Sequence, residues 1–89
     1  MSATPPDAIP AYDVVLDERG RLCPLPVIAL GRAAVADPDA RVLLLADDPA
    51  AETDVPAWCE LRGRTLAWTG DAPDGQGRAY VVVPPTAGA

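Results

Sequence analysis

Short apolar segments alternate along this chain with turn residues, and this alternation is the feature that most restricts its fold. Residues 41–46 form a nearly continuous apolar run between a helical pattern and Asp47-Asp48-Pro49, which is typical of a buried strand. Residues 24–37 instead repeat apolar side chains at helical spacing, up to a proline that disfavours further helix. By the same criteria, the sequence predicts strands over 12–17, 41–46, 65–69 and 79–83 and helices over 24–37 and 50–62.

Pro56 lies within the second helical pattern, where a proline normally breaks a helix. It is harmless if Asp54 is the N-cap, because a proline in the first turn replaces an N–H that has no intrahelical partner. Gly63 follows the pattern as a residue that readily adopts a left-handed conformation at a helix end. The sequence therefore predicts a regular helix between Asp54 and Gly63.

The order β-α-β-α-β-β predicts an α/β (α+β) fold, a two-layer sandwich. A right-handed crossover pairs the first two strands in parallel and places both helices on one face of a four-stranded mixed sheet. The 89 residues suit a single domain, which we assign to residues 12–83. Residues 1–11, rich in proline and small side chains, predict a disordered lead-in, and residues 84–89 predict a flexible tail.

The charged residues exclude several classes of function. All seven basic residues are arginine, thirteen residues are acidic, and the formal net charge is −6. The chain lacks the basic stripe of a nucleic-acid-binding protein, so we expect no direct contact with nucleic acid. The acidic balance favours a partner with a basic docking surface, or serves only solubility.

The absence of histidine removes further chemistry. No Cys-His or Ser-His pair can be built, and two cysteines without histidine cannot form a four-ligand zinc site. We therefore expect no metal and no other cofactor. No apolar run reaches the length of a membrane span and no signal-peptide pattern is visible, so we expect a cytoplasmic monomer without membrane contact.

Cys23 opens the first predicted helix and is followed by two prolines. With Pro24 at the first helical position, Cys23 becomes the N-cap, whose side chain accepts an N–H from the first turn. Pro26 has no N–H, which leaves the Leu25 N–H as the donor directed at the sulfur. A thiolate accepts this bond better than a thiol does, and the positive end of the helix dipole favours it further. The sequence thus predicts a reactive thiolate at Cys23.

Neighbouring charges act on this thiolate in both directions. Arg19 and Arg21 favour a negative sulfur, whereas Asp17 and Glu18 oppose it. The alternative is a small buried cysteine that opens the helix and is inert. The polar approach through Gly20 and Arg21 favours the reactive interpretation, as does the usual exposure of a helix start at the carboxyl end of a strand.

Several separate motifs resemble one known family. Residues 16–26, LDERGRLCPLP, resemble the Cys-Pro-x-Pro signature of the TusA/SirA-like sulfur-carrier family, including its leading Leu-Asp and Gly. Residues 47–50 (DDPA) and 54–59 (DVPAWC) resemble that family's second conserved stretch, and Gly63 resembles its helix-ending glycine. The resemblance runs from residue 13 to residue 69 and is expected to continue through the last strand.

The resemblance implies a βαβαββ fold in which Cys23 accepts sulfane sulfur as a persulfide and relays it to an acceptor protein. It implies a donor of the cysteine desulfurase or rhodanese-like kind, and an acceptor in tRNA thiolation, cofactor assembly or sulfur oxidation. The chain departs from the family's pattern at Arg32, the one basic residue left on the first helix, and at Arg64, where a histidine is common. A rival interpretation is a non-catalytic interaction or redox-regulatory module of the same fold.

The second cysteine is better explained by packing. Cys59 lies beside Trp58 on an apolar helix face, where cysteine acts mostly as a small hydrophobe. The alternative is a resolving thiol that forms a disulfide with Cys23. Such a disulfide requires the two Cα atoms to lie within about 7 Å, and we expect Cys23 and Cys59 to lie farther apart than this.

Aromatic and acidic residues elsewhere are also expected to be structural. Trp58, Trp68 and Tyr80 are predicted at the core or its edge, because no arginine or lysine is interleaved with them. Asp47 and Asp48 precede a proline, so we expect them to form a turn and helix lead-in rather than an acid-base pair.

Overall fold

Six elements of secondary structure follow one another in the predicted order β-α-β-α-β-β. The computed structural model describes residues 9–22 and 24–85. The elements are β1 Val14–Asp17, α1 Leu25–Ala36, β2 Val42–Ala46, α2 Ala51–Arg62, β3 Thr65–Asp71 and β4 Arg78–Val83.

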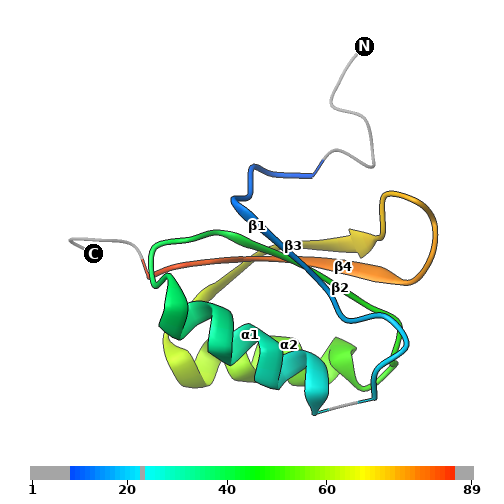
Figure 1. The fold of residues 1–89 in the computed structure, drawn as a ribbon, viewed down its shortest axis with the longest axis horizontal. Coiled ribbons are helices and arrows are strands. Elements are labelled where there is room, and N and C mark those ends of the chain that lie inside the picture. The colour runs from blue at the N-terminus through cyan, green and yellow to red at the C-terminus, as the bar shows by residue number, and fades with distance from the viewer. Residues whose placement is uncertain (1–8, 23, 86–89) are drawn as a thin grey trace.

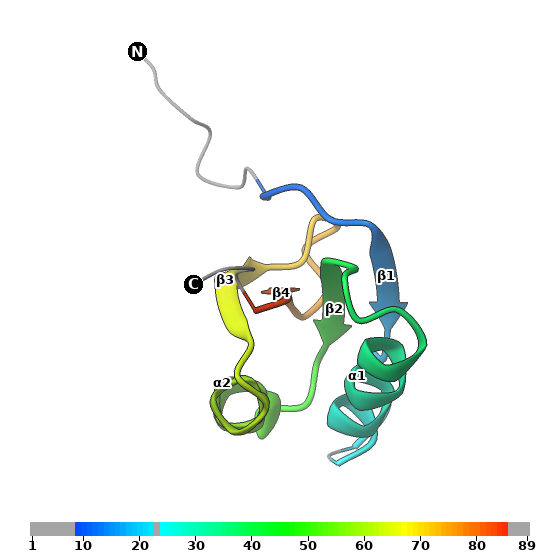
Figure 2. The same cartoon turned by 90° about the vertical axis from the view of Figure 1, so that its left-hand side faces the viewer.

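The strands form one mixed sheet in the order β1-β2-β4-β3. β1 pairs in parallel with β2, whereas β4 pairs antiparallel with both β2 and β3. Figures 1 and 2 show both helices on the same face of this sheet. The predicted two-layer sandwich is therefore confirmed.

The main core lies between the helices and the sheet. Leu30 of α1 packs there with Val55 and Trp58 of α2 against β2 and β4. Tyr80 of β4 is 1% exposed, and its hydroxyl donates to Glu52 Oε2 of α2 over 3.0 Å. Burial, together with this hydrogen bond, raises the pKa of Tyr80 to about 12. The prediction that Trp58 and Tyr80 belong to the core is confirmed.

β2 is buried on both of its faces, which explains its unbroken apolar sequence. Alternate residues face the helices, while Leu43 and Leu45 join a smaller cluster on the opposite face. Trp68, half-buried as expected for the edge of a core, packs against this second cluster together with Ile9. A residue that precedes β1 thus contributes to the sheet's outer face.

α2 starts within one residue of the predicted range 50–62, but its N-cap is Ala50 and not Asp54. The helix begins at Ala51 rather than after Asp54, so Pro56 lies inside it, on an exposed surface. Asp48 sets the earlier start, because its Oδ1 accepts the Ala50 N–H and its carbonyl oxygen accepts the Ala51 N–H, each over 3.0 Å. The predicted turn and helix lead-in at Asp48 is confirmed. The helix tolerates the loss of the one backbone hydrogen bond that Pro56, which has no N–H, cannot donate.

The strands differ from their predicted bounds by one or two residues. The largest extension is at the end of β3, which continues through Gly70 to Asp71. The Trp68 ring lies so close to Gly70 that a Cβ there would be 2.6 Å from Trp68 Cζ2. A register shift between Leu66 and Trp68 marks a β-bulge in the same strand. Gly70 pairs with Ala79 of β4, and a larger residue at this position would force the indole to move.

Gly31 and Gly63 allow one substitution to be tested in two backbone conformations. Gly31 lies inside α1, where a Cβ would meet Trp58 Nε1 at an ordinary 3.8 Å. Gly31→Ala is expected to raise the free energy of unfolding by up to about 1 kcal/mol through helix propensity. Gly63 has a φ of +69°, so Gly63→Ala is expected to lower it by about 1 kcal/mol. Urea unfolding checks both values, and shifts of the same sign would contradict the assignment.

Candidate functional site

The residues of the predicted site lie in the loop that joins β1 to α1. Figure 1 shows this loop at the end of the sheet where the chain passes from β1 to the helix layer. Gly20, Arg21, Pro24 and Leu25 are described there, whereas Cys23 lies outside the described residues. The structure therefore gives the frame around this position, and the role of Cys23 stays a prediction.

The start of α1 differs from the predicted arrangement. Pro24 occupies the N-cap position, which we had expected of Cys23, and the helix begins at Leu25. The Leu25 N–H, expected to point at the sulfur, donates instead to the Leu22 carbonyl oxygen over 3.0 Å. The Leu22 carbonyl oxygen therefore uses this donor. The Ile28 N–H donates to the Pro24 carbonyl oxygen over 2.9 Å, as expected for an N-cap at Pro24.

Pro26 anchors the first turn of α1 in the core. It is the second helical residue, not the third as predicted, and its side chain is fully buried. The first turn carries no acidic residue, so no carboxylate within it offsets the positive end of the helix dipole. The start of α1 therefore favours a negative group beside it.

Gly20 is held by an aspartate from the next crossover. The Gly20 N–H donates to Asp47 Oδ1 over 2.9 Å, and Gly20 has a φ of +85° that glycine adopts without strain. Asp47 immediately follows β2, whose carboxyl end lies beside that of β1 in the parallel pair. The loop before α1 is thereby attached to the end of β2.

Arg19 attaches the same loop to the β3–β4 connection. Its guanidinium donates to both oxygens of Asp17, at 2.9 and 2.7 Å, and to both oxygens of Asp74, at 2.9 and 2.7 Å. It also donates to the Gln76 carbonyl oxygen over 3.1 Å. The side-chain hydrogen bond from Arg19 lowers the pKa of Asp17 to about 2. Two carboxylates therefore balance the charge that we had expected to favour a thiolate.

Gly77 brings the β3–β4 connection close to the end of β2. Its φ is +88°, and a Cβ there would lie 2.9 Å from the Ala46 carbonyl oxygen and 3.2 Å from Asp47 Cβ. Any other residue would push these segments apart. Gly77 thus completes a junction at which the β2–α2 and β3–β4 connections meet the β1–α1 loop.

Arg21 and Leu22 are the exposed residues that lead up to position 23. Arg21 forms a looser ion pair with Glu18, in which Nε lies 3.5 Å from Oε1. Leu22 is 73% exposed, an unusual position for a large apolar side chain. Of the two arginines predicted to favour a thiolate, Arg21 is the one more weakly held by a carboxylate.

Cys59 lies in the main core, as predicted. Its side chain is buried beside Trp58 and Val55 in the cluster between the helices and the sheet. Burial raises the pKa of the Cys59 thiol. Because the thiolate is the reactive form, this environment makes Cys59 a poor nucleophile.

Two open grooves begin next to position 23, on either side of α1. The larger, about 530 Å³, runs between β1 and the outer face of α1 and is lined by Arg21, Leu25 and Ile28 among others. The smaller, about 270 Å³, runs between α1 and α2 and is mostly apolar, with Pro24 and Leu61 in its lining. The described part of the chain contains no group of three potential metal ligands.

Sequence reasoning missed the residues that hold the loop in place. Asp47 was assigned only to a turn, and Asp74 had no assigned role. A β-α-β order places the residues after the first two strands at one sheet edge, so Asp47 could have been placed near Gly20. The pairing of Arg19 with Asp74 depends on how the β3–β4 connection folds back, for which the sequence contains no comparable signal.

The hydrogen bond from Gly20 to Asp47 can be tested with two variants. Asp47→Ala removes the acceptor and is expected to speed hydrogen exchange at the Gly20 amide by about tenfold. Asp47→Asn keeps an oxygen acceptor and is expected to stay within about threefold of the parent chain. Equal exchange rates in the parent and Asp47→Ala would show that this bond does not hold the loop.

The ion pairs of Arg19 predict acid sensitivity. Asp17 has a pKa of about 2 instead of 3.8 in the folded chain, so the unfolded chain binds more protons between these values. Stability from this pair is present above pH 3.8 and is lost as the pH falls through about 2. Asp13, whose pKa is also about 2 because of hydrogen bonds from Arg41, adds a second such contribution.

Urea midpoints measured from pH 5 to pH 2, a range that spans roughly these pKa values, separate the two pairs. Arg19→Gln is expected to flatten the loss of stability that arises from Asp17, and Arg41→Gln the loss that arises from Asp13. An unchanged pH dependence in Arg19→Gln would contradict the role of this ion pair.

Comparison with known protein families identifies the family of this chain. Within residues 9–22 and 24–85, no helix is long and apolar enough to cross a membrane. The family model described as "Sulfurtransferase TusA" matches residues 14–83, from the first residue of β1 to the last residue of β4. Proteins of this family act as sulfur carriers together with donor and acceptor proteins. The match covers most of the chain and every element of its fold, and the chain belongs to the TusA sulfurtransferase family.

Proposed function

We propose that this protein is a sulfur carrier that accepts sulfane sulfur on Cys23 as a persulfide and relays it to an acceptor protein. The observation that supports this proposal most directly is the family match together with the position of Cys23 in the loop before α1. That loop is held by hydrogen bonds to the β2–α2 and β3–β4 connections. The first turn of α1 adds the positive end of a helix dipole without a carboxylate of its own.

The proposed transfer consists of two exchange steps. In the first, the Cys23 thiolate attacks the outer sulfur of a donor persulfide, the donor's S–S bond breaks, and the donor leaves as a thiolate. In the second, an acceptor thiolate attacks the outer sulfur now carried by Cys23, and Cys23 is released as a thiolate. No net oxidation or reduction accompanies either exchange, so neither step needs an electron donor or acceptor.

The environment of Cys59 supports Cys23 as the carrier. Cys59 is buried in the core, and its raised pKa opposes ionisation. A donor protein cannot reach it without opening the packing between α2 and the sheet. The chain has no histidine, so proton transfer during the exchange is left to the partner proteins.

Exposed apolar residues around the loop supply a docking face for these partners. Leu22 is 73% exposed, and the groove beside β1 adds Leu25 and Ile28. Exposed apolar side chains grouped on one surface are typical of protein interaction sites. We propose that donor and acceptor proteins use this face in turn, because each must reach the same sulfur.

Intact-mass spectrometry tests the carrier role. The parent chain and Cys59→Ala are expected to gain about 32 Da, the mass of one sulfur atom, after incubation with glutathione persulfide. Cys23→Ser is expected to gain no mass. Uptake of sulfur by Cys23→Ser would move the carrier site to Cys59 and contradict the proposal.

Alkylation under native conditions tests the accessibility of the two thiols. Cys23 is expected to react with iodoacetamide at least about tenfold faster than Cys59, because only the thiolate reacts and burial disfavours it at Cys59. Peptide mass spectrometry at successive times gives both rates. Comparable rates at the two cysteines would contradict this difference.

A further inference from the structure

Three arginines on the helix face differ from the others in their partners. Arg19, Arg21, Arg41 and Arg78 each form an ion pair with a carboxylate. Among the described residues, Arg32, Arg62 and Arg64 form no such pair. All three line one open groove of about 530 Å³ between the carboxyl-terminal halves of α1 and α2.

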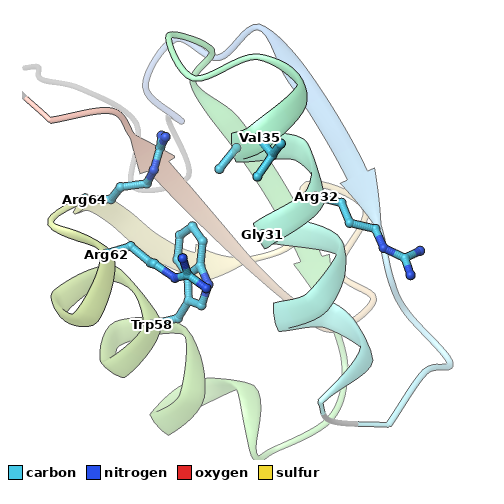
Figure 3. Close-up of a pocket in the computed structure, with 7 residues that line it drawn as sticks. Gly31, Arg32, Val35, Trp58, Arg62 and Arg64 are labelled. Carbon is cyan, nitrogen blue, oxygen red and sulfur yellow. The ribbon is translucent and has the colours of Figure 1, made fainter.

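Two of these arginines lie on the α2 side of the groove together with Trp58. Figure 3 shows Arg62 and Arg64 on the same side as the Trp58 indole, whereas Arg32 extends away on the other side of α1. Arg64 Nη2 donates to the Pro38 carbonyl oxygen over 3.3 Å, which keeps its guanidinium at the rim. Two arginines without carboxylate partners thus line the groove together with one indole.

The indole of Trp58 adds a buried donor to this groove. Trp58 is 7% exposed and lines this groove. Gly31 lies opposite, where even a Cβ would stay 3.8 Å from Nε1. The indole N–H is therefore a donor that a ligand in the groove can use.

The polar side chains that line the groove are all of one kind. Arginine and tryptophan side chains donate hydrogen bonds and accept none. The remaining lining residues, Gly31, Ala34 and Val35, have no polar side chain. A ligand that satisfies this lining must therefore accept several hydrogen bonds and carry negative charge.

We propose that this groove binds an oxyanion, held by the guanidinium groups of Arg62 and Arg64 and by the indole N–H of Trp58. Guanidinium groups bind planar and tetrahedral oxyanions through paired hydrogen bonds. The chain as a whole carries a formal charge of −6, so these arginines are a local exception to its acidic balance.

The site is separate from the β1–α1 loop. Gly31 is six residues after the first residue of α1, which places the groove about 9 Å along the helix from its start. The proposal goes beyond the carrier role and does not depend on it. A defect in sulfur uptake at Cys23 and a defect in anion binding are measured by different readouts.

The indole N–H resonances of the full chain provide the test. Inorganic sulfate is titrated at constant ionic strength with chloride as the balancing anion. The Trp58 indole resonance is expected to shift to saturation, while that of Trp68, in the outer face of the sheet, serves as an internal control and stays unchanged. A linear response shared by both indoles would overturn the proposal.

Variants identify the groups that bind the anion. Arg62→Gln and Arg64→Gln are each expected to weaken sulfate binding by at least about fivefold. Arg21→Gln removes the same charge from the groove beside β1. This control variant is expected to change the sulfate affinity by less than about twofold. Unchanged sulfate binding in both groove variants would overturn the proposal.

A blocked tetraglutamate peptide distinguishes two sources of the oxyanion. Binding at least about tenfold tighter than sulfate would identify carboxylates of a partner protein. Equal or weaker binding would identify a free small oxyanion. A saturable response to neither probe would overturn the proposal.

Discussion

The burial of β2 on both faces is the constraint on which the rest of the structure depends. Its five residues are all buried, so the strand must lie inside the sheet, with the helices on one side and the smaller cluster that includes Trp68 on the other. The parallel partner β1 then brings the two strand ends together at one edge. Asp47 follows β2 directly and reaches Gly20 for this reason. A change in the register of β2 would therefore displace the loop that carries Cys23.

The charges of the chain are distributed unevenly over this frame. Carboxylates pair with arginines at the sheet edges and at the β3–β4 connection, where Arg19 binds Asp17 and Asp74. The unpaired arginines of the described chain gather instead over the helices. The acidic net charge thus hides two electrostatic regions with different functions: one orders the loop before α1, and the other is open to a ligand.

The fold could be predicted because the spacing of apolar residues and the positions of turn residues indicate the same elements along the whole chain. The unbroken apolar run of β2 indicated double burial, and Cys59 beside Trp58 indicated a core position; both are confirmed. The helix bounds agree with the prediction to within one residue, whereas the N-caps differ, because local hydrogen bonds decide them. Asp48 places the start of α2 at Ala51 rather than after Asp54, and the Leu22 carbonyl oxygen takes the Leu25 N–H. These hydrogen bonds depend on the local backbone geometry, which cannot be predicted from the residue types alone.

Transfer of isotopically labelled sulfur through the chain tests the central claim most directly. A donor persulfide with a labelled outer sulfur is added to the Cys59→Ala protein, excess donor is removed, and an acceptor thiol is then supplied. The account predicts that the label appears first on the Cys23 peptide and then leaves it as the acceptor gains the label. Label that reaches the acceptor at the same rate in a Cys23→Ser protein would contradict the account.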